Sequence, residues 1–360
     1  MDIIILRLIN QQLAGGKLNT AKELVAWMGA MQAQDYTQAK WAIGVRLPHL
    51  TEQQIESAFN GGEIFRTHLM RPTWHFVSAD DIYWMLELTA PQIKSVLNSR
   101  HRELGLTEAL VNQSHAVIEK ALSGNQSMSR ESLLQELQKA NIPTDLQRAS
   151  HFMLRAEIDG LICSGVIQGK KQTYALLSER VPVKKTLSKD EALAKLAKSY
   201  FTSHGPATLP DFVWWSGLPV TAARKGLEMN KPGLNSFVLG PDTYWFSQQE
   251  THVKKLPDSV YLLPAFDEFL ISYKNRSAVI TAEDHKKAIS ENGIFRPVVL
   301  VNGQISGLWK RTLKKDSMVI ETEYFRPHNQ SEEQLMARAA DSLGHFSEKK
   351  AALKFTEMTP

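Results

Sequence analysis

The chain of 360 residues contains one cysteine, Cys163, and no long apolar run. A single cysteine excludes an internal disulfide bond and fits a reducing compartment, so we expect a cytoplasmic protein. No stretch approaches the roughly 20 apolar residues of a membrane-spanning helix. The opening Met1-Asp-Ile-Ile-Ile-Leu6 is too short, and has the wrong flanks, for a secretory signal. We therefore expect no membrane partner.

Three chemical signatures are missing as well. No cluster of Cys or His has the spacing of a zinc site, and there is neither a Gly-rich phosphate loop nor a Gly-x-Ser-x-Gly elbow. We therefore expect no metal and no cofactor. The net charge of +4 permits a polyanionic partner without requiring one. Hydrophobic residues make up 43% and charged residues 22%, as in ordinary globular proteins, and this length predicts two to four domains.

The middle of the chain repeats one pattern of elements: a helix, a helix-turn-helix and a hairpin. Its first occurrence has predicted helices at 107–122, 129–137 and 146–158 and strands at 161–167 and 173–177. Its second has helices at 192–203, 209–216 and 220–229 and a hairpin at 237–246. This order of elements is typical of a winged helix.

The N-terminal part follows the same order. Helices are predicted at 4–13, 20–28 and 35–47, then an inserted helix at 51–59 and a strand-rich stretch at 63–77. After residue 257 the pattern changes to short strands at 260–271, 277–280, 297–309 and 318–325, closed by a helix at 331–346 that starts at a capping Ser331. We expect an α+β protein, mainly helical: three tandem winged helices (1–100, 101–186 and 187–256) and a C-terminal antiparallel, barrel-like β domain (257–360).

Tandem winged helices favour double-stranded DNA as the partner, bound by a monomer. The third helices of the second and third units carry few side chains that read bases, with Arg224 and Lys225 the only basic residues in the last. Contact through the phosphate backbone and DNA shape is therefore favoured over recognition of an operator. The alternatives are a non-catalytic DNA-binding or transcription-regulating protein and, because winged helices also bind proteins, an interaction scaffold.

Four blocks of the sequence resemble the winged-helix DNA glycosylases of the AlkZ and YcaQ type. They are residues 28–35 (MGAMQAQD), 66–77 (RTHLMRPTWHFV), 262–277 (LLPAFDEFLISYKNRS) and 293–303 (GIFRPVVLVNG). The family's catalytic signature is Gln-x-Gln in the AlkZ-like branch and Gln-x-Asp in the YcaQ-like branch, and this chain has Gln32-Ala33-Gln34. The resemblance implies a DNA repair enzyme that cuts the N-glycosidic bond of alkylated purines and, in some members, unhooks interstrand crosslinks.

Two neutral amides suit such a reaction. A purine alkylated at N7 is already cationic and leaves without a strong general acid. The amides of Gln32 and Gln34 can hold a water and direct a carbonyl dipole at the oxocarbenium-like sugar. The structural alternative is that both glutamines only cap helix ends or satisfy buried backbone groups. For Asp35 we expect the N-cap of the next helix.

Further candidates for DNA or lesion binding come from the other blocks. In the predicted strand 63–77, alternation places Thr67, Arg71, Thr73 and His75 on one face, with Arg66 beside them. For Arg71 and His75 a purely structural role is an equal alternative. For His68 and Trp74 we expect core contacts instead.

The FDEF segment is expected to be a strand that sends Asp267 and Glu268 to opposite faces, which weakens a paired acid/base role. We expect them to pair with Tyr273, Lys274 or Arg276 at the mouth of the site. The Lys310-Arg311 doublet, beside a predicted turn, can contact phosphate or be a solvated loop.

Overall fold

The computed structural model describes residues 2–169, 171–247 and 255–356. Its first unit contains the predicted helices, α1 (Ile3–Asn10), α2 (Ala21–Met28), α3 (Tyr36–Gly44) and α4 (Glu52–Asn60). Local capping fixes where they start: Thr20 and Glu23 form a capping box at α2, and Asp35 accepts a hydrogen bond from the Gln38 N–H at α3. Asp35 is thus the N-cap that the sequence predicts.

A three-stranded sheet in the order β1-β3-β2 completes the first unit, with strands β1 (Met31–Gln32), β2 (Ile64–Met70) and β3 (Thr73–Ser78). The prediction of one strand over 63–77 is wrong, because the chain turns between β2 and β3. Arg71 occupies this turn with a φ of 52°, followed by Pro72. Within each strand alternation still holds, and Thr67 lies directly opposite His75 across the β2–β3 pair.

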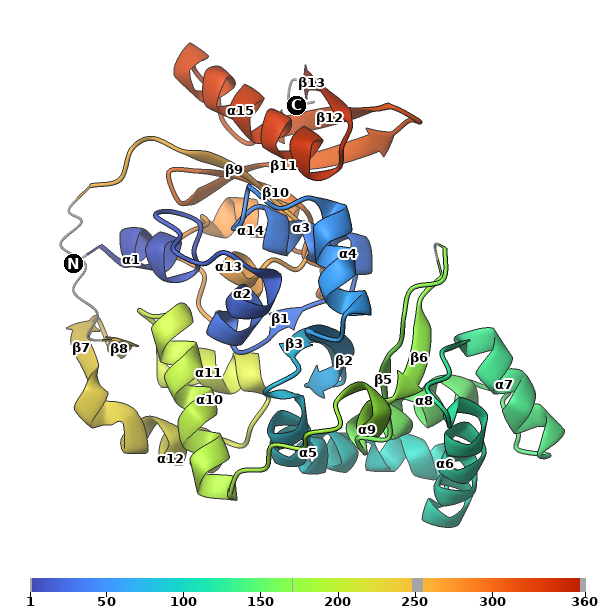
Figure 1. Cartoon of the computed structure of the whole chain (residues 1–360). Helices are drawn as coiled ribbons and strands as arrows, with labels where there is room; N and C mark the ends of the chain where they lie inside the picture. Colours follow the sequence, from blue (N-terminus) through green and yellow to red (C-terminus); the bar gives the residue numbers. More distant parts are fainter. Residues whose placement is uncertain (1, 170, 248–254, 357–360) are drawn as a thin grey trace.

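The second and third units confirm the predicted winged-helix order. The second contains α6 (Glu108–Leu122), α7 (Arg130–Lys139), α8 (Arg148–Ile158) and a sheet of β4 (Met128–Ser129), β6 (Thr173–Leu176) and β5 (Ile162–Ser164), followed by α9 (Leu177–Arg180). The third contains α10 (Lys189–Ser203), α11 (Leu209–Ser216), α12 (Val220–Asn230), a 3-10 turn (Lys231–Gly233) and the hairpin of β7 (Leu234–Leu239) and β8 (Asp242–Ser247). Figure 1 shows these two units on either side of the lower half of the molecule.

A helix that the sequence analysis does not predict, α5 (Ile82–Glu103), joins the first unit to the second. It has 22 residues with Pro91 inside, and its apolar side chains follow no strong helical stripe. It runs across the predicted boundary at residue 100, below the first sheet (Figure 1). No helix among the described residues has both the length and the apolarity to cross a membrane.

The C-terminal part forms a five-stranded sheet in the order β13-β12-β11-β10-β9. Its elements are β9 (Val260–Leu263), α13 (Glu268–Ile271), α14 (Ala282–Ala288), β10 (Val298–Val301), β11 (Gln304–Leu313), β12 (Ser317–Tyr324), α15 (Gln330–Phe346) and β13 (Lys350–Thr356). The hairpin at Asn302-Gly303 is confirmed. The sheet is not wholly antiparallel, because β13 pairs with β12 in parallel. Residues 277–280 form no strand, and Asn329 rather than Ser331 caps α15.

Helix α3, the third helix of the first unit, is packed into the core of the molecule. Trp41 of α3 is 1% exposed, packs on Phe346 of α15 at 5.1 Å between ring centroids and donates to the Leu262 carbonyl of β9. A single apolar cluster therefore joins α2 and α3 to the C-terminal sheet and α15. This burial leaves the N-terminal end of α3, next to Gln34, as its accessible part.

Candidate functional site

The glutamine motif lies where β1 leads into α3, and four hydrogen bonds fix its main chain. The Gln32 N–H donates to Glu268 Oε1 at 2.5 Å, and the Ala33 N–H donates to the Trp74 carbonyl at 2.8 Å. Arg66 then binds two consecutive carbonyls, Ala33 through Nε at 2.8 Å and Gln34 through Nη2 at 3.2 Å. The turn that presents the motif is therefore rigidly held.

The two glutamine side chains have different surroundings. Gln32 is 6% exposed, and its Oε1 accepts a hydrogen bond from Arg71 Nη2 at 2.7 Å. Because a guanidinium group only donates, this contact fixes the amide with its oxygen toward Arg71 and its NH₂ group free to donate elsewhere. Gln34 is exposed. One amide is thus locked in place and the other is open to solvent.

Arg66 and Arg71 bring positive charge to both sides of the motif. The Arg66 guanidinium lies 4.0 Å from the centre of the Trp74 ring and also donates to Gln172 Oε1 at 2.7 Å. Burial lowers the pKa of both arginines, and in each case nearby acidic groups oppose the effect, Glu157 at Arg66 and Glu268 at Arg71. Despite leaving the strand at a turn, Arg71 still reaches Gln32.

Glu268 is an acidic group buried behind the motif. The sequence predicts a strand for the FDEF segment, and this prediction is wrong. The segment forms the start of α13, and Asp267 is its N-cap. Glu268 is 1% exposed and also accepts hydrogen bonds from Trp215 Nε1 at 3.1 Å and from the Ser272 hydroxyl. Burial alone would raise its pKa, but His204, Ser272 and the Gln32 N–H outweigh burial and lower the pKa to about 2. The carboxylate is thus ionised in the folded protein.

The predicted partners of the FDEF carboxylates are wrong. Asp267 forms a bidentate ion pair with Arg46, with both Nη···Oδ distances at 2.8 Å. Tyr273 is fully buried and donates to the His204 carbonyl at 2.7 Å, so it does not lie at the mouth of a site. Arg276 is half-buried and donates to the Leu270 carbonyl. Sequence distance misleads here, because Arg46 lies 221 positions from Asp267.

His75 and Thr67 form a buried polar pair on the sheet beside Gln32. His75 is directly opposite Gln32 in the β1–β3 pair, and its Nδ1 lies 3.0 Å from the Thr73 carbonyl. Burial first, and then the charge of Arg71, lower its pKa to about 3, so the ring is neutral near pH 7. The Thr67 hydroxyl and His75 Nε2 have no hydrogen-bond partner among the described residues.

The remaining candidates lie apart from the motif or form hydrogen bonds that hold the fold together. Thr73 donates its hydroxyl to the Met70 carbonyl and closes the β2–β3 turn. Lys310 and Arg311 belong to β11, not to a turn, and Lys310 is exposed with Glu321 at 3.1 Å. His68 and Trp74 are half-buried and both contact Glu157 of α8, so they bond within the protein as expected but do not lie in the core.

Two of the three potential recognition helices are built into the core. In α8, residues 152–158 are all buried, and Glu157 binds the first unit. Most of α3 is buried under α15. Neither helix can enter a major groove without disrupting this packing. The first and second units can therefore contact DNA only through their helix termini, turns and loops.

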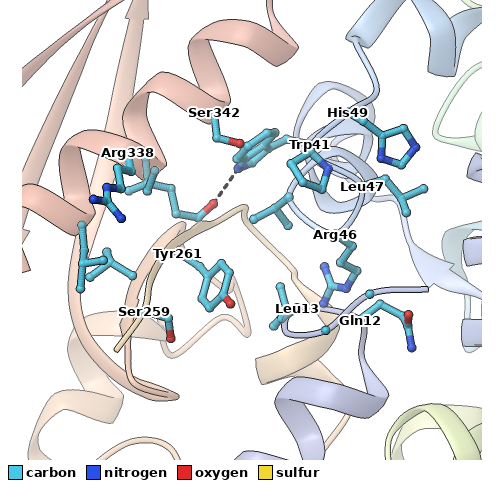
Figure 2. Close-up of a pocket in the computed structure, with 18 of the residues that line it drawn as sticks. Gln12, Leu13, Trp41, Arg46, Leu47, His49, Ser259, Tyr261, Arg338 and Ser342 are labelled. Carbon is cyan, nitrogen blue, oxygen red and sulfur yellow. Dashed lines mark hydrogen bonds between the residues drawn. The ribbon is translucent and has the colours of Figure 1, made fainter. Parts of the chain in front are cut away.

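A cavity of about 550 Å³ has Arg46, the partner of Asp267, in its wall. Figure 2 shows it between the end of α3, β9 and α15, with Arg46, Tyr261 and Arg338 around it. Gln32 and Gln34 do not line this cavity. The cavity is therefore separate from the glutamine site.

Tandem winged-helix units beside a glutamine motif with one buried and one exposed amide place the chain among winged-helix proteins that act on DNA. Residues 25–346 match the family model described as DNA glycosylase AlkZ-like. The chain therefore belongs to the AlkZ-like family of DNA glycosylases, which confirms the resemblance in the sequence. It is a DNA N-glycosylase that binds DNA and acts in its repair.

Both a sequence relative and a solved structure from Streptomyces sahachiroi are similar to this chain. One, named interstrand DNA cross-link repair glycosylase, is 23% identical over 310 residues, which are 81% of this chain and 82% of that protein. The other is the solved structure of DNA glycosylase AlkZ, with a TM-score of 0.82, 19% identity and coverage of 98% of both chains. The structural match confirms the α+β fold.

Proposed function

We propose that the protein hydrolyses the N-glycosidic bond of purines that carry a positive charge through alkylation at N7, within double-stranded DNA. The cationic base leaves as a neutral molecule, so no protonation is required. The water adds to the sugar carbon as oxocarbenium-like character develops there, the C–N electron pair leaves with the base, and the proton that the water loses passes to the solvent. Protein groups then need only to hold the water and to stabilise this charge.

The observation that carries the proposal is the different exposure of the two amides. Arg66 fixes the main chain of Gln34, and the Gln34 side chain is exposed. The side-chain carbonyl oxygen can therefore accept a hydrogen bond from the attacking water and point its dipole at the sugar. Gln32 has its oxygen occupied by Arg71, so its NH₂ group serves as a donor. Gln34 therefore orients the water, and Gln32 supports the geometry from behind.

The ionisable groups near the motif do not offer a general acid at neutral pH. The low pKa of Glu268 keeps it as a carboxylate, and the low pKa of His75 keeps its ring neutral. Both favour a reaction in which the base supplies its own charge. The buried negative charge of Glu268, bonded to the Gln32 N–H, also favours positive charge developing nearby.

We propose that the enzyme is monofunctional, because strand cleavage by a glycosylase requires an amine nucleophile. The lysine nearest in sequence to the motif is Lys40 of α3. Its ammonium group is buried and lies 2.5 Å from both Glu52 and Glu56. An amine held in this way is a poor nucleophile, which supports water as the nucleophile.

The proposal extends to interstrand crosslinks. The Streptomyces sahachiroi relative is named for their repair, and a crosslink through purine N7 atoms leaves each base cationic. Gln34 lies at an exposed turn, so a bulky adduct or a second strand does not have to fit an enclosed pocket. The same chemistry can then release a methylated base or unhook a crosslink.

The experiment compares Gln34→Ala with the wild type on a duplex that contains N7-methylguanine. The variant should bind the duplex within about twofold of the wild type and lose at least about 100-fold in single-turnover base release, the scale of one positioned catalytic group. Abasic product is detected by cleavage with alkali. Unchanged release by the variant would remove Gln34 from the mechanism. If the wild type instead binds a defined sequence and forms no abasic product, the protein is a non-catalytic DNA-binding regulator.

A further inference from the structure

The two adjacent tryptophans of α11 are each connected to Gln32 through one intermediate residue. Trp215 is buried and donates to Glu268, which accepts the Gln32 N–H. Trp214 lies beside Arg71, whose guanidinium carbon is 5.9 Å from the ring centre and which donates to the Gln32 side chain. The third unit thus contacts both supports of the motif, and Trp214 is the partly exposed one, at 38%.

A second guanidinium group lies over Trp214. The guanidinium carbon of Arg276 is 5.3 Å from the ring centre, and the indole N–H is anchored to the Ile271 carbonyl at 2.8 Å. Two arginines from distant parts of the chain therefore share one aromatic side chain, which stabilises each of them through cation–π contact. Gly217 follows at the end of α11 and allows Arg71 to approach, because a Cβ there would meet Arg71 Cγ at 2.9 Å.

Neither arginine is neutralised within the described part of the chain. Arg71 and Arg276 have no ion pair within 4.0 Å there, and the buried atoms Arg71 Nε and Arg276 Nη2 have no hydrogen-bond partner, although each guanidinium donates elsewhere, to Gln32 and to the Leu270 carbonyl. The carboxylate of Asp211 forms no ion pair with either group and accepts the backbone N–H groups of Thr208, Lys274 and Asn275, although its charge still acts on Arg276 from a longer distance. Two like charges at partly buried positions repel each other and are poorly solvated, which an anion between or beside them would relieve.

The surroundings of Arg276 suit a phosphate group. A cavity of about 600 Å³ beside it is lined by the basic or imidazole side chains of Lys274, Arg276 and His285 and also by the carboxylates of Asp211 and Asp242. The Ser277 and Thr281 hydroxyls in its wall already donate to Asn275 and Asp284. Burial lowers the pKa of Arg276 to about 10, with Asp211 opposing and Arg71 adding to the shift. The group still carries its charge near pH 7, so it can bind an anion.

We propose that Arg71, Trp214 and Arg276 form a site for backbone phosphates of the DNA strand that carries the damaged base. This inference rests on the proposed function, since it places the strand beside Gln32. Guanidinium groups bind phosphate oxygens in bidentate fashion, and Trp214 holds both groups in position. Because α8 and most of α3 are buried, such a site, formed by residues of the first unit, the third unit and the C-terminal part, supplies DNA contact that those helices cannot provide.

The test measures the affinity of the full chain for an undamaged duplex over a range of KCl concentrations, which does not depend on base release. The variants are Arg276→Gln, Arg276→Lys and Trp214→Ala. The matched control is Arg338→Gln, which removes an exposed charge from α15. Thermal denaturation of each variant verifies that it is folded.

Arg276→Gln should lower the slope of log K against log [KCl] by about one, as the loss of one phosphate contact does. Arg276→Lys should keep the slope, and Trp214→Ala should weaken binding about two- to fivefold through loss of cation–π support. Affinities and slopes equal to those of Arg338→Gln in all three variants would overturn the phosphate site. Failure of the proposed function has a separate signature, because the wild type would then release no base from alkylated DNA, whatever these slopes are.

Discussion

Arg71 Nη2 donates a hydrogen bond to Gln32 Oε1 at 2.7 Å, although 39 positions separate the two residues. The contact joins the β2–β3 turn to the glutamine motif and fixes which end of the Gln32 amide faces the site. Arg71 is itself positioned by its left-handed backbone and by close approach to Gly217. The orientation of Gln32 therefore depends on a glycine in the third unit.

Gly217→Ala tests this dependence. The new methyl group would meet Arg71 Cγ at 2.9 Å and displace it, so base release should fall about 10- to 100-fold. Gly105→Ala is the matched control, since Gly105 has a similar φ of 65° with no atom within 4 Å of a Cβ. Both variants should lose about 1–2 kcal/mol of stability in urea denaturation, from left-handed backbone strain. Equal base release by the two variants would show that Arg71 does not position Gln32.

Glu268→Gln tests the buried carboxylate through acid stability. The folded pKa of about 2 lies below the ordinary value of 4.5, so ionised Glu268 stabilises the protein above pH 4.5. That stabilisation is lost as the pH falls from 4.5 toward 2, with a slope of up to about 1.4 kcal/mol per pH unit. The variant should be less stable at pH 7 and should lack this part of the acid slope in denaturant titrations.

The control for that titration is Glu103→Gln, which changes an exposed carboxylate at the end of α5. It should keep the wild-type dependence of unfolding free energy on pH between 4.5 and 2. If Glu268→Gln also keeps the full wild-type slope, Glu268 is not the ionised group that the geometry indicates.

Asp35→Ala tests whether the start of α3 positions Gln34. Loss of the N-cap should cost about 1 kcal/mol in unfolding free energy and should also lower base release, because the residue next to Gln34 is freed. Thr51→Ala removes a comparable cap from α4. It should cost a similar amount of stability and leave base release near that of the wild type. Base release by Asp35→Ala at the wild-type rate would show that the N-cap of α3 does not position Gln34 for catalysis.

The sequence predicts much of the fold because its signals are local. Capping residues such as Thr107, Ser129 and Asp35 mark helix starts in the structure where the pattern places them. Helix α5 was missed, since its apolar positions are irregular and Pro91 interrupts the pattern. The FDEF segment has the pattern of a strand and forms the start of a helix, because a short, buried apolar run looks the same in both.

The site is harder to predict because distant residues form it. Glu268 lies 236 positions from the Gln32 N–H that it accepts, and no local pattern reveals that contact. The Arg71-Pro72 turn was hidden within a stretch that alternates like one strand. The sequence predicts only that Trp214 belongs to a helix. Two adjacent tryptophans in one short helix point to different sides of it, which indicates contacts with two neighbours. The catalytic roles of Gln32 and Gln34 stay predictions.

The most direct measurement compares two duplexes, one with cationic N7-methylguanine and one with its neutral isostere, 7-methyl-7-deazaguanine, under single-turnover conditions. If two amides suffice because the base leaves with its own charge, the cationic base should be released at least about 100- to 10,000-fold faster, the contribution of the general acid that the site lacks. Release of both bases at similar rates would contradict the account, since the protein would then have to supply a proton.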